Sequence, residues 1–453
     1  MSDLPSVPDP TSGPNTPSEP RVDASIPLVS CFGSVFVLLA LAHVVTTLGT
    51  VGPAQVYRKD LLQDYLAARA VLKGEDPYQP MKALRAKYVG RTDGILAFPH
   101  PTPHPPPALL LTLPLGLTTY PVGAAVWLAS EYLLLGLCSI LVARYVWGAQ
   151  KTRVPLAFIV LALATRPVLD DLVLGQFSVV LLALLTGAYL ALRGGRRMLG
   201  GLLLGAAVSL KFLGWPLILF YAWKRQGKVI LSAALAFLAL NAASAVVMPG
   251  AIAKYYREIA PRAGGDYAAS DLNISVWTLG QRIFGGLYSQ ATTNAVTAPP
   301  LIDRPELASR AGGVMALATF LIFLVAAVKL QDENDGFLVM LSVSTVLNPI
   351  AWEIYLTLLL LPLAVIGHRL AQRSWPPRPS LAFAGLVGML IALKIPHHLA
   401  LGNGDSSDVS ALRALLTIIP LLWPLTTAWA VARMARSRPD SSQFTASSVD
   451  LAG

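Results

Sequence analysis

Apolar runs separated by short polar segments recur along almost the whole chain. A run of roughly 20 apolar residues can cross a bilayer as a helix, whereas shorter runs fit partial helices packed on protein. The pattern therefore predicts an all-α, polytopic membrane bundle of about twelve transmembrane or partial helices. The runs lie at 27–50, 108–119, 120–143, 154–169, 177–192, 199–210, 212–223, 228–248, 311–330, 336–350, 352–367, 380–399 and 411–432.

Two long polar segments, 51–107 and 249–310, interrupt these runs. We predict them to be large loops of a single membrane-embedded domain covering 25–435. The two ends of the chain differ in composition from the apolar runs: 1–24 is rich in Pro, Ser and Asp, and 436–453 is rich in Ser. Such segments cannot bury enough apolar surface to fold, so we predict two disordered tails.

The composition agrees with a membrane protein, because 54% of residues are apolar and only 13% are charged, against about 25% charged in soluble domains. The net charge of +10 does not indicate a nucleic-acid partner, since the basic residues are scattered between apolar runs. By the positive-inside rule they mark cytoplasmic loops, which places both tails inside and both large loops outside. Successive helices cross the membrane in alternating directions, and this arrangement holds only if 199–210 and 212–223 are two short helices that meet at Lys211. The clusters are Arg144/Lys151/Arg153, Arg196/Arg197, Lys224/Arg225, Arg369/Arg373/Arg378 and Arg433/Arg436/Arg438.

The first large loop contains the charged stretch YRKDLLQDYLAARAVLKGEDPYQP at 57–80. Asp60 and Asp64 are four residues apart, so a helix places both on one face. Beside them runs an apolar stripe, and Gly74 lies where the helix would end. We predict a short amphipathic helix at the membrane surface that presents its carboxylates just beyond the lipid; a solvated interfacial helix without chemistry is the alternative. The stripe is Leu61, Tyr65, Ala68 and Leu72.

Lys211 stands between two short apolar helices, at the predicted outer turn of a hairpin. Polar groups at membrane depth are functional candidates by default. Its ammonium could bind an anionic headgroup, or the side chain could simply snorkel to the interface.

Other polar candidates fall on the same predicted outer side as Asp64, and this convergence is stronger than any one of them. Two carboxylates and an amide occupy a short outer turn, another carboxylate follows a tryptophan at a second tight turn, and the rest lie in the second large loop. They are Asp170, Asp171 and Gln176; Trp352 and Glu353; and Asn273, Ser275 and Arg282.

We predict neither a metal site nor a cofactor. His100 and His104 have the spacing of a zinc pair on a helix, but the surrounding prolines forbid that helix. The sequence also has no phosphate-binding glycine loop, dinucleotide fingerprint or nucleophile elbow.

Taken together, these motifs resemble glycosyltransferase family 87, integral-membrane enzymes of the GT-C type that use polyprenyl-phosphate sugars. QDYLAARAVLKGEDPY is similar to the family's first-loop signature. His104 begins a segment similar to the family's Tyr-Pro-Pro and replaces the tyrosine. Further similar segments follow in the family's order, from about 57 to 367: LGQFSVVLLALL at 174–185, the hairpin at 200–216, LNIS at 272–275 and NPIAW at 348–352.

The resemblance implies that Asp64 is the general base of an inverting sugar transfer to a hydroxyl of a lipid-linked or cell-envelope glycan. The family's best-known donors carry mannose, so a hexose such as mannose is the expected sugar. Lys211 and Arg282 would stabilise the departing lipid phosphate. The enzyme would lie in the plasma membrane with its active site outside, and would need no nucleotide. One position departs from the family, because Ile354 stands where members often have histidine. From the residues and the resemblance together, we predict that the substrates contact Asp60, Tyr65, Tyr78, His104, Asp171, Gln176, Lys211, Asn273, Ser275, Arg282, Trp352 and Glu353.

The main alternative is a multi-pass transporter or flippase of lipids or glycolipids, which broken helices and intramembrane charge would also suit. A transporter of this kind should show corresponding interrupted segments in two related halves. The sequence shows no internal repeat, which favours the enzyme.

Overall fold

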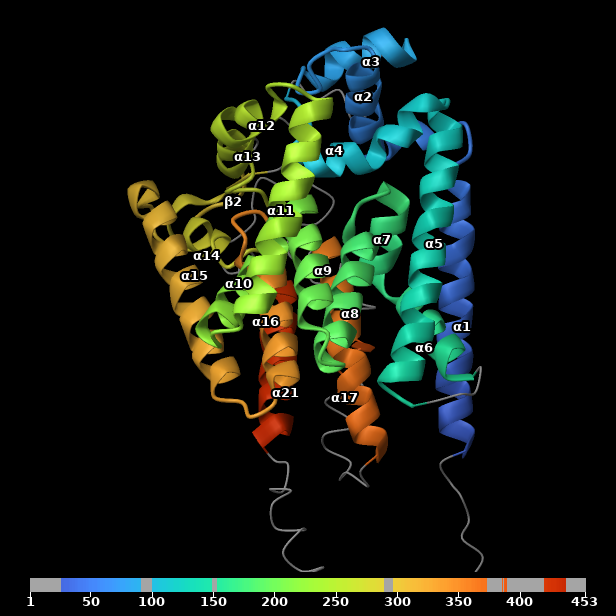
Figure 1. Cartoon of the computed structure of the whole chain (residues 1–453), viewed down its shortest axis with the longest axis vertical. Helices are drawn as coiled ribbons and strands as arrows, with labels where there is room; N and C mark the ends of the chain where they lie inside the picture. The colour runs from blue at the N-terminus through green and yellow to red at the C-terminus, as the bar shows by residue number, and fades with distance from the viewer. Residues whose placement is uncertain are drawn as a thin grey trace, which may run out of the picture.

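The computed structural model describes residues 26–90, 100–148, 153–288, 296–372 and 419–436, together with 385, 387 and 388. Within them the chain is mainly helical, and Figure 1 shows the long helices running side by side as a bundle. The described residues also form one small antiparallel ribbon, β1 (Leu287–Tyr288) with β2 (Val296–Ala298). The predicted all-α, membrane-type fold is therefore confirmed.

The helices follow the apolar runs closely. The first are α1 (Ile26–Gly49), α2 (Leu61–Leu72), α3 (Met81–Val89), α4 (Pro106–Thr112), α5 (Tyr120–Tyr145), α6 (Arg153–Ala164), α7 (Arg166–Leu174) and α8 (Ser178–Arg193). Next come α9 (Arg197–Leu210), α10 (Trp215–Trp223), α11 (Gly227–Val247), α12 (Ala251–Lys254), α13 (Ala260–Asp266) and α14 (Thr278–Gly280). The last are α15 (Pro305–Val328), α16 (Glu333–Leu347), α17 (Leu360–Gln372) and α21 (Ile419–Arg436). Short 3-10 or π-helical turns are η1 (Val56–Arg58), η2 (Leu113–Leu117), η3 (Phe212–Gly214), η4 (Tyr255–Ile259), η5 (Gln281–Gly285) and η6 (Glu353–Leu359).

Among the described residues, four helices are long and apolar enough to cross a membrane, or five if α7 and α8, bent by 120°, count as one span. The four are Tyr120–Tyr145, Gly227–Val247, Pro305–Val328 and Glu353–Gln372. Several shorter apolar helices accompany them, so the number of about twelve spans stays a prediction. The span expected at 380–399, the start of that at 411–432 and nearly all of both tails lie outside the described residues.

The expected span at 154–169 is wrong, because the chain forms two helices there. α6 ends at Ala164 and α7 begins at Arg166, with Pro167 in its first turn. Proline lacks the N–H that a continuing helix needs, so it favours a new start. Asp170 and Asp171 consequently lie on α7 and not in an outer turn, and Gly175, at φ +68°, ends that helix in the left-handed region.

The amphipathic character predicted for the first-loop helix is also wrong. Nearly every side chain of α2 is buried, because α3, α4, η2 and α5 pack around it. Small residues make this close approach possible: a Cβ placed on Gly116 would come within 3.2 Å of Ala68. The helix is thus part of the folded core and does not lie exposed on a membrane surface.

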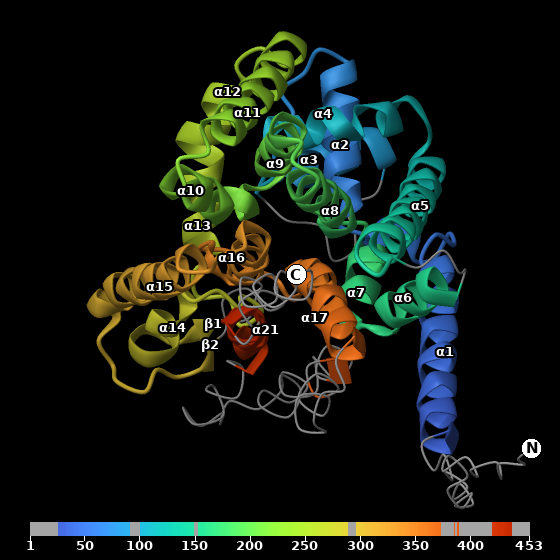
Figure 2. The ribbon, with the colours of Figure 1, turned by 60° about the horizontal axis from the view of Figure 1, so that its bottom comes forward.

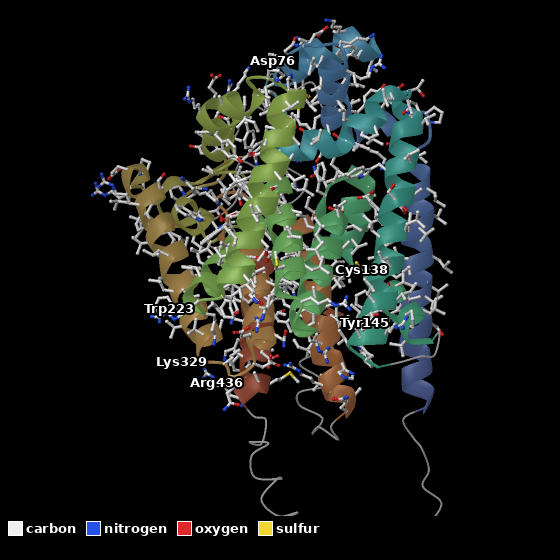
Figure 3. All side chains as sticks on the ribbon, in the orientation of Figure 1. Asp76, Cys138, Tyr145, Trp223, Lys329 and Arg436 are labelled. Atoms are coloured by element: carbon white, nitrogen blue, oxygen red, sulfur yellow. The ribbon has the colours of Figure 1, made fainter. Side chains whose placement is uncertain are left out.

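The two large loops meet at one end of the bundle. Figure 1 places α2, α3, α12 and α13 there, and the carboxylate of Asp76 pairs with the ammonium of Lys254 across the two loops. Figure 3 shows Trp223, Lys329 and Arg436 at the other end, far from Asp76. In Figure 2, α1 lies at the edge of the bundle, whereas α16, buried from Asp335 to Leu347, lies against α10 and α15.

The orientation of this bundle is open to a labelling test. We expect Ala86→Cys, on an exposed position of α3, to react with an impermeant thiol reagent added to intact cells, and Lys228→Cys to react only after lysis, because the positive-inside rule places it in the cytoplasm. Both variants would be made after replacing Cys31 and Cys138. The reverse labelling pattern would overturn the topology.

Candidate functional site

Asp64 and His104, forty positions apart in the sequence, form a buried pair. Asp64 lies in the first turn of α2 and is 1% exposed. Its Oδ1 is 2.6 Å from His104 Nδ1, and since a carboxylate can only accept, the imidazole donates. Its Oδ2 is buried and has no hydrogen-bond partner within the described residues. One oxygen of Asp64 is therefore held in place while the other stays available.

His104 is held by the proline-rich segment that precedes α4. Its backbone N–H donates to Thr102 Oγ1 at 3.3 Å, and its carbonyl accepts from the Tyr78 hydroxyl at 2.9 Å. The prolines that follow restrict the backbone and start α4, so the backbone of His104 is fixed from both sides. His100 does not join it, because its Nε2 lies 3.2 Å from the Tyr267 hydroxyl. The described residues contain no cluster of three His, Cys, Asp or Glu side chains that could hold a metal ion.

A second buried polar chain lies beside this pair and runs through Asp60, Gln176 and Lys211. Gln176 Nε2 donates to Asp60 Oδ2 at 2.9 Å, and Lys211 Nζ donates to Gln176 Oε1 at 3.0 Å. Burial raises the pKa of the Asp60 carboxyl, and the Gln176 amide together with the charge of His104 opposes that rise. The chain brings together the start of α2, the turn between α7 and α8, and the break between α9 and α10.

Lys211 is 8% exposed and lies inside the protein, so it does not extend to the surface as a snorkelling side chain would. Its Nζ lies 4.7 Å from the centre of the Tyr355 ring and 5.8 Å from that of Phe177. Phe177 in turn packs edge-on against His104, with ring centres 5.1 Å apart. Phe177 therefore links the two groups, and we call Asp60, Asp64, His104, Gln176 and Lys211 the carboxylate cluster.

Lys59 is a contributor that the sequence did not reveal. It is 2% exposed, and its Nζ donates to the carbonyls of Leu172 at 3.0 Å and Val173 at 2.7 Å, at the end of α7. Burial lowers the pKa of its amine to about 8, and the charge of Glu131 opposes this shift. Lys59 directly precedes Asp60, so its contacts hold this position of the chain against the end of α7, next to the turn that carries Gln176. No local pattern could have shown this, because a lysine in a polar loop is normally exposed.

Asp171, predicted to contact substrate, caps a helix. Its Oδ1 and Oδ2 accept from the backbone N–H groups of Ser178 and Val179, at 3.1 and 3.0 Å, in the first turn of α8. With both oxygens used and 0% exposure, it stabilises the bend between α7 and α8.

We expect Asp171→Ala to lower the free energy of unfolding by about 1–3 kcal/mol, because two buried N–H groups lose their acceptor. Asp170→Ala is the matched control: Asp170 pairs with Arg166, a partly exposed interaction that contributes less. Thermal unfolding of the purified protein measures both. If both variants are equally stable and the sugar transfer implied by the family resemblance is lost only in Asp171→Ala, Asp171 contacts substrate and its capping role is minor.

Tyr65 and Tyr78 support the site through backbone contacts. The Tyr65 hydroxyl donates to the Thr118 carbonyl at 2.9 Å, and that of Tyr78 to the His104 carbonyl. Their hydroxyls are thereby engaged within the protein and position the site, and their contact with substrate stays a prediction.

Asn273 and Ser275 clamp the second large loop to the segment after α16. Asn273, 0% exposed, donates to the carbonyls of Tyr267 and Pro349 and accepts from the N–H groups of Ser275 and Ala351. Ser275 donates to the Asn348 carbonyl. These bonds engage the side chains that were predicted to bind substrate, and they fix the segment that carries Trp352.

Arg282 joins the same clamp, since its guanidinium donates to Thr278 Oγ1 and to the Asn273 carbonyl. The structure thus places it in the loop's own framework and not in the carboxylate cluster. Trp352 packs edge-on against Tyr267, with ring centres 5.4 Å apart, and Glu353 begins η6. Gln176 and Lys211 join Asp64 in the carboxylate cluster, as does His104, and Asp171 lies within electrostatic reach of Lys211. That all the candidates lie on the outer side of the membrane stays a prediction.

Comparison with known proteins gives one match. The sequence model of glycosyltransferase family 87 matches residues 103–351. No curated protein and no solved structure matches the chain. The matched segment contains His104, Gln176 and Lys211 and begins after Asp64, whose place in the site rests on its contact with His104. Since the match covers more than half of the 453 residues, the chain belongs to glycosyltransferase family 87 and is a membrane glycosyltransferase.

Proposed function

We propose that this glycosyltransferase moves a hexose, with mannose as the first candidate, from a polyprenyl-phosphate donor to a hydroxyl of a lipid-linked or cell-envelope glycan. The reaction takes place at the outer face of the plasma membrane, inverts the anomeric centre and needs no nucleotide cofactor. The observation that carries the proposal is the state of Asp64: His104 holds one carboxylate oxygen, and the other is buried without a partner among the described residues.

Asp64 is suited to act as general base. A base must lie within hydrogen-bond reach of the proton that it takes, and Asp64 Oδ2 has an unused lone pair for an acceptor hydroxyl. As that proton transfers, the acceptor oxygen bonds to the anomeric carbon and the bond from this carbon to the phosphate oxygen breaks. The bonding pair leaves with the polyprenyl phosphate. His104 keeps the carboxylate oriented throughout.

Lys211 is the proposed cation for the departing phosphate. Its ammonium has three donors, and within the described residues one of them is used, on Gln176. In a buried site such a charge stabilises a developing phosphate far better than in water. Gln176 fixes Lys211 relative to Asp60. Since Asp60 directly precedes α2 and Asp64 lies in its first turn, the cation and the base keep a constant relation.

The experiment is a donor panel. We expect the purified protein to transfer radiolabel to a glycolipid from one polyprenyl-phosphate sugar, and not from the corresponding nucleotide sugar. Movement of a fluorescent glycolipid across proteoliposomes, without any new glycosidic bond, would indicate a flippase. Transfer from nucleotide sugars would overturn the donor class.

A further inference from the structure

Arg85, on α3 in the first large loop, is a buried cation. It is 3% exposed, and its Nε and Nη1 have no hydrogen-bond acceptor within the described residues. Arginine stays charged under all ordinary conditions. Burying a charge with no compensating group is costly, so such residues normally have an anionic partner. The described residues supply no acceptor to Nε or Nη1 of Arg85.

Tyr120, at the start of α5, lies in the same region and also has an unused donor. It is 3% exposed, and its hydroxyl has no partner within the described residues. Its ring packs between those of Tyr57 and Tyr65, with centres 5.5 and 5.0 Å away. Arg85, Asp60 and Asp64 are all within electrostatic reach of this hydroxyl. An anion held by Arg85 and Tyr120 would therefore lie beside the carboxylate cluster.

We infer that Arg85 and Tyr120 form a binding site for a phosphoryl group of a substrate. The guanidinium offers charge-assisted N–H donors to phosphate oxygens, and the hydroxyl adds another donor. This inference deepens the proposed function and rests on it for the nature of the substrates. The phosphoryl group has two sources, the lipid phosphate of the donor or the phosphate of a phospholipid-anchored acceptor.

The test measures binding to the full-length protein in nanodiscs. The probes are a polyprenyl monophosphate, short-chain phosphatidylglycerol and inorganic phosphate. We expect Arg85→Met to weaken binding of a lipid phosphate by at least about 30-fold, because a desolvated charged partner is lost. Tyr120→Phe, which keeps the ring packing, should weaken it by about 5-fold through loss of one hydrogen bond. A loss confined to polyprenyl phosphate identifies the donor, and one confined to phosphatidylglycerol identifies the acceptor.

Lys82→Gln is the matched control, because Lys82 carries the same charge on the exposed side of the same helix. Its binding should equal that of the unchanged protein. Ligand-free Arg85→Met should unfold at the same temperature or higher, since an unpaired buried charge has been removed. A lower unfolding temperature with unchanged binding would show a structural role and overturn the inference. So would failure of the unchanged protein to bind any of the probes.

Binding and transfer separate this inference from the proposed function. If Arg85 governs phosphoryl binding but no polyprenyl-phosphate sugar is a donor, the proposed donor fails and the site stands. If Asp64→Asn loses transfer from a polyprenyl-phosphate sugar while Arg85→Met binds every probe normally, the site fails and the proposed function stands.

Discussion

Asp64→Asn is expected to abolish sugar transfer, slowing it by roughly 100- to 10,000-fold, while expression and donor binding stay close to normal. Asparagine has nearly the same size and can still accept a hydrogen bond from His104, so the local fold should persist. It cannot take a proton from the acceptor hydroxyl. Single-turnover transfer with saturating donor, alongside an equilibrium donor-binding measurement, separates the two effects.

Asp60→Asn is the control on the same segment. The Asp60 carboxylate already accepts a hydrogen bond from Gln176, and an amide oxygen can replace that contact. We therefore expect a much milder effect on transfer. Near-normal turnover of Asp64→Asn would place the base elsewhere, and Glu353 would be the next carboxylate to change, because Asp171 caps α8.

Lys211→Ala is expected to weaken donor binding by about 2–5 kcal/mol, the usual result of removing one partner from a desolvated charged pair. The loss should fall on the affinity for the donor and for free polyprenyl phosphate, which both carry the phosphate. Isothermal titration or fluorescence binding with the purified protein measures it.

Lys254→Ala provides the comparison at the same end of the bundle. Lys254 pairs with Asp76 in a partly exposed contact, and such pairs contribute about 0–1 kcal/mol. Its donor affinity should match that of the unchanged protein. If Lys211→Ala folds normally and binds donor equally well, Lys211 serves only to hold Gln176.

The apolar pattern predicted most helix positions well because hydropathy is a local property. The runs at 27–50 and 228–248 correspond to Ile26–Gly49 and Gly227–Val247. The break before α7 could also have been predicted, since Pro167 is incompatible with a continuous helix. Long apolar runs without an internal proline predicted the helix boundaries accurately.

Contacts between segments that are distant in the sequence could not be predicted from the local pattern. The spacing of α2 indicates one apolar face, but its burial on nearly all sides depends on α3, α4 and α5. The pairing of Asp64 with His104 joins residues forty positions apart, and only the resemblance to the family placed His104 at the substrates. Arg85, in a polar loop, showed no sign of being buried.

The configuration of the new glycosidic bond tests the central claim most directly. A single carboxylate base in one displacement requires inversion, whereas retention requires a second, covalent step at the enzyme. The measurement is the one-bond carbon–proton coupling at the anomeric centre, in donor and in product, by nuclear magnetic resonance. We predict opposite configurations in donor and product; the same configuration in both would contradict Asp64 as the base of a direct transfer.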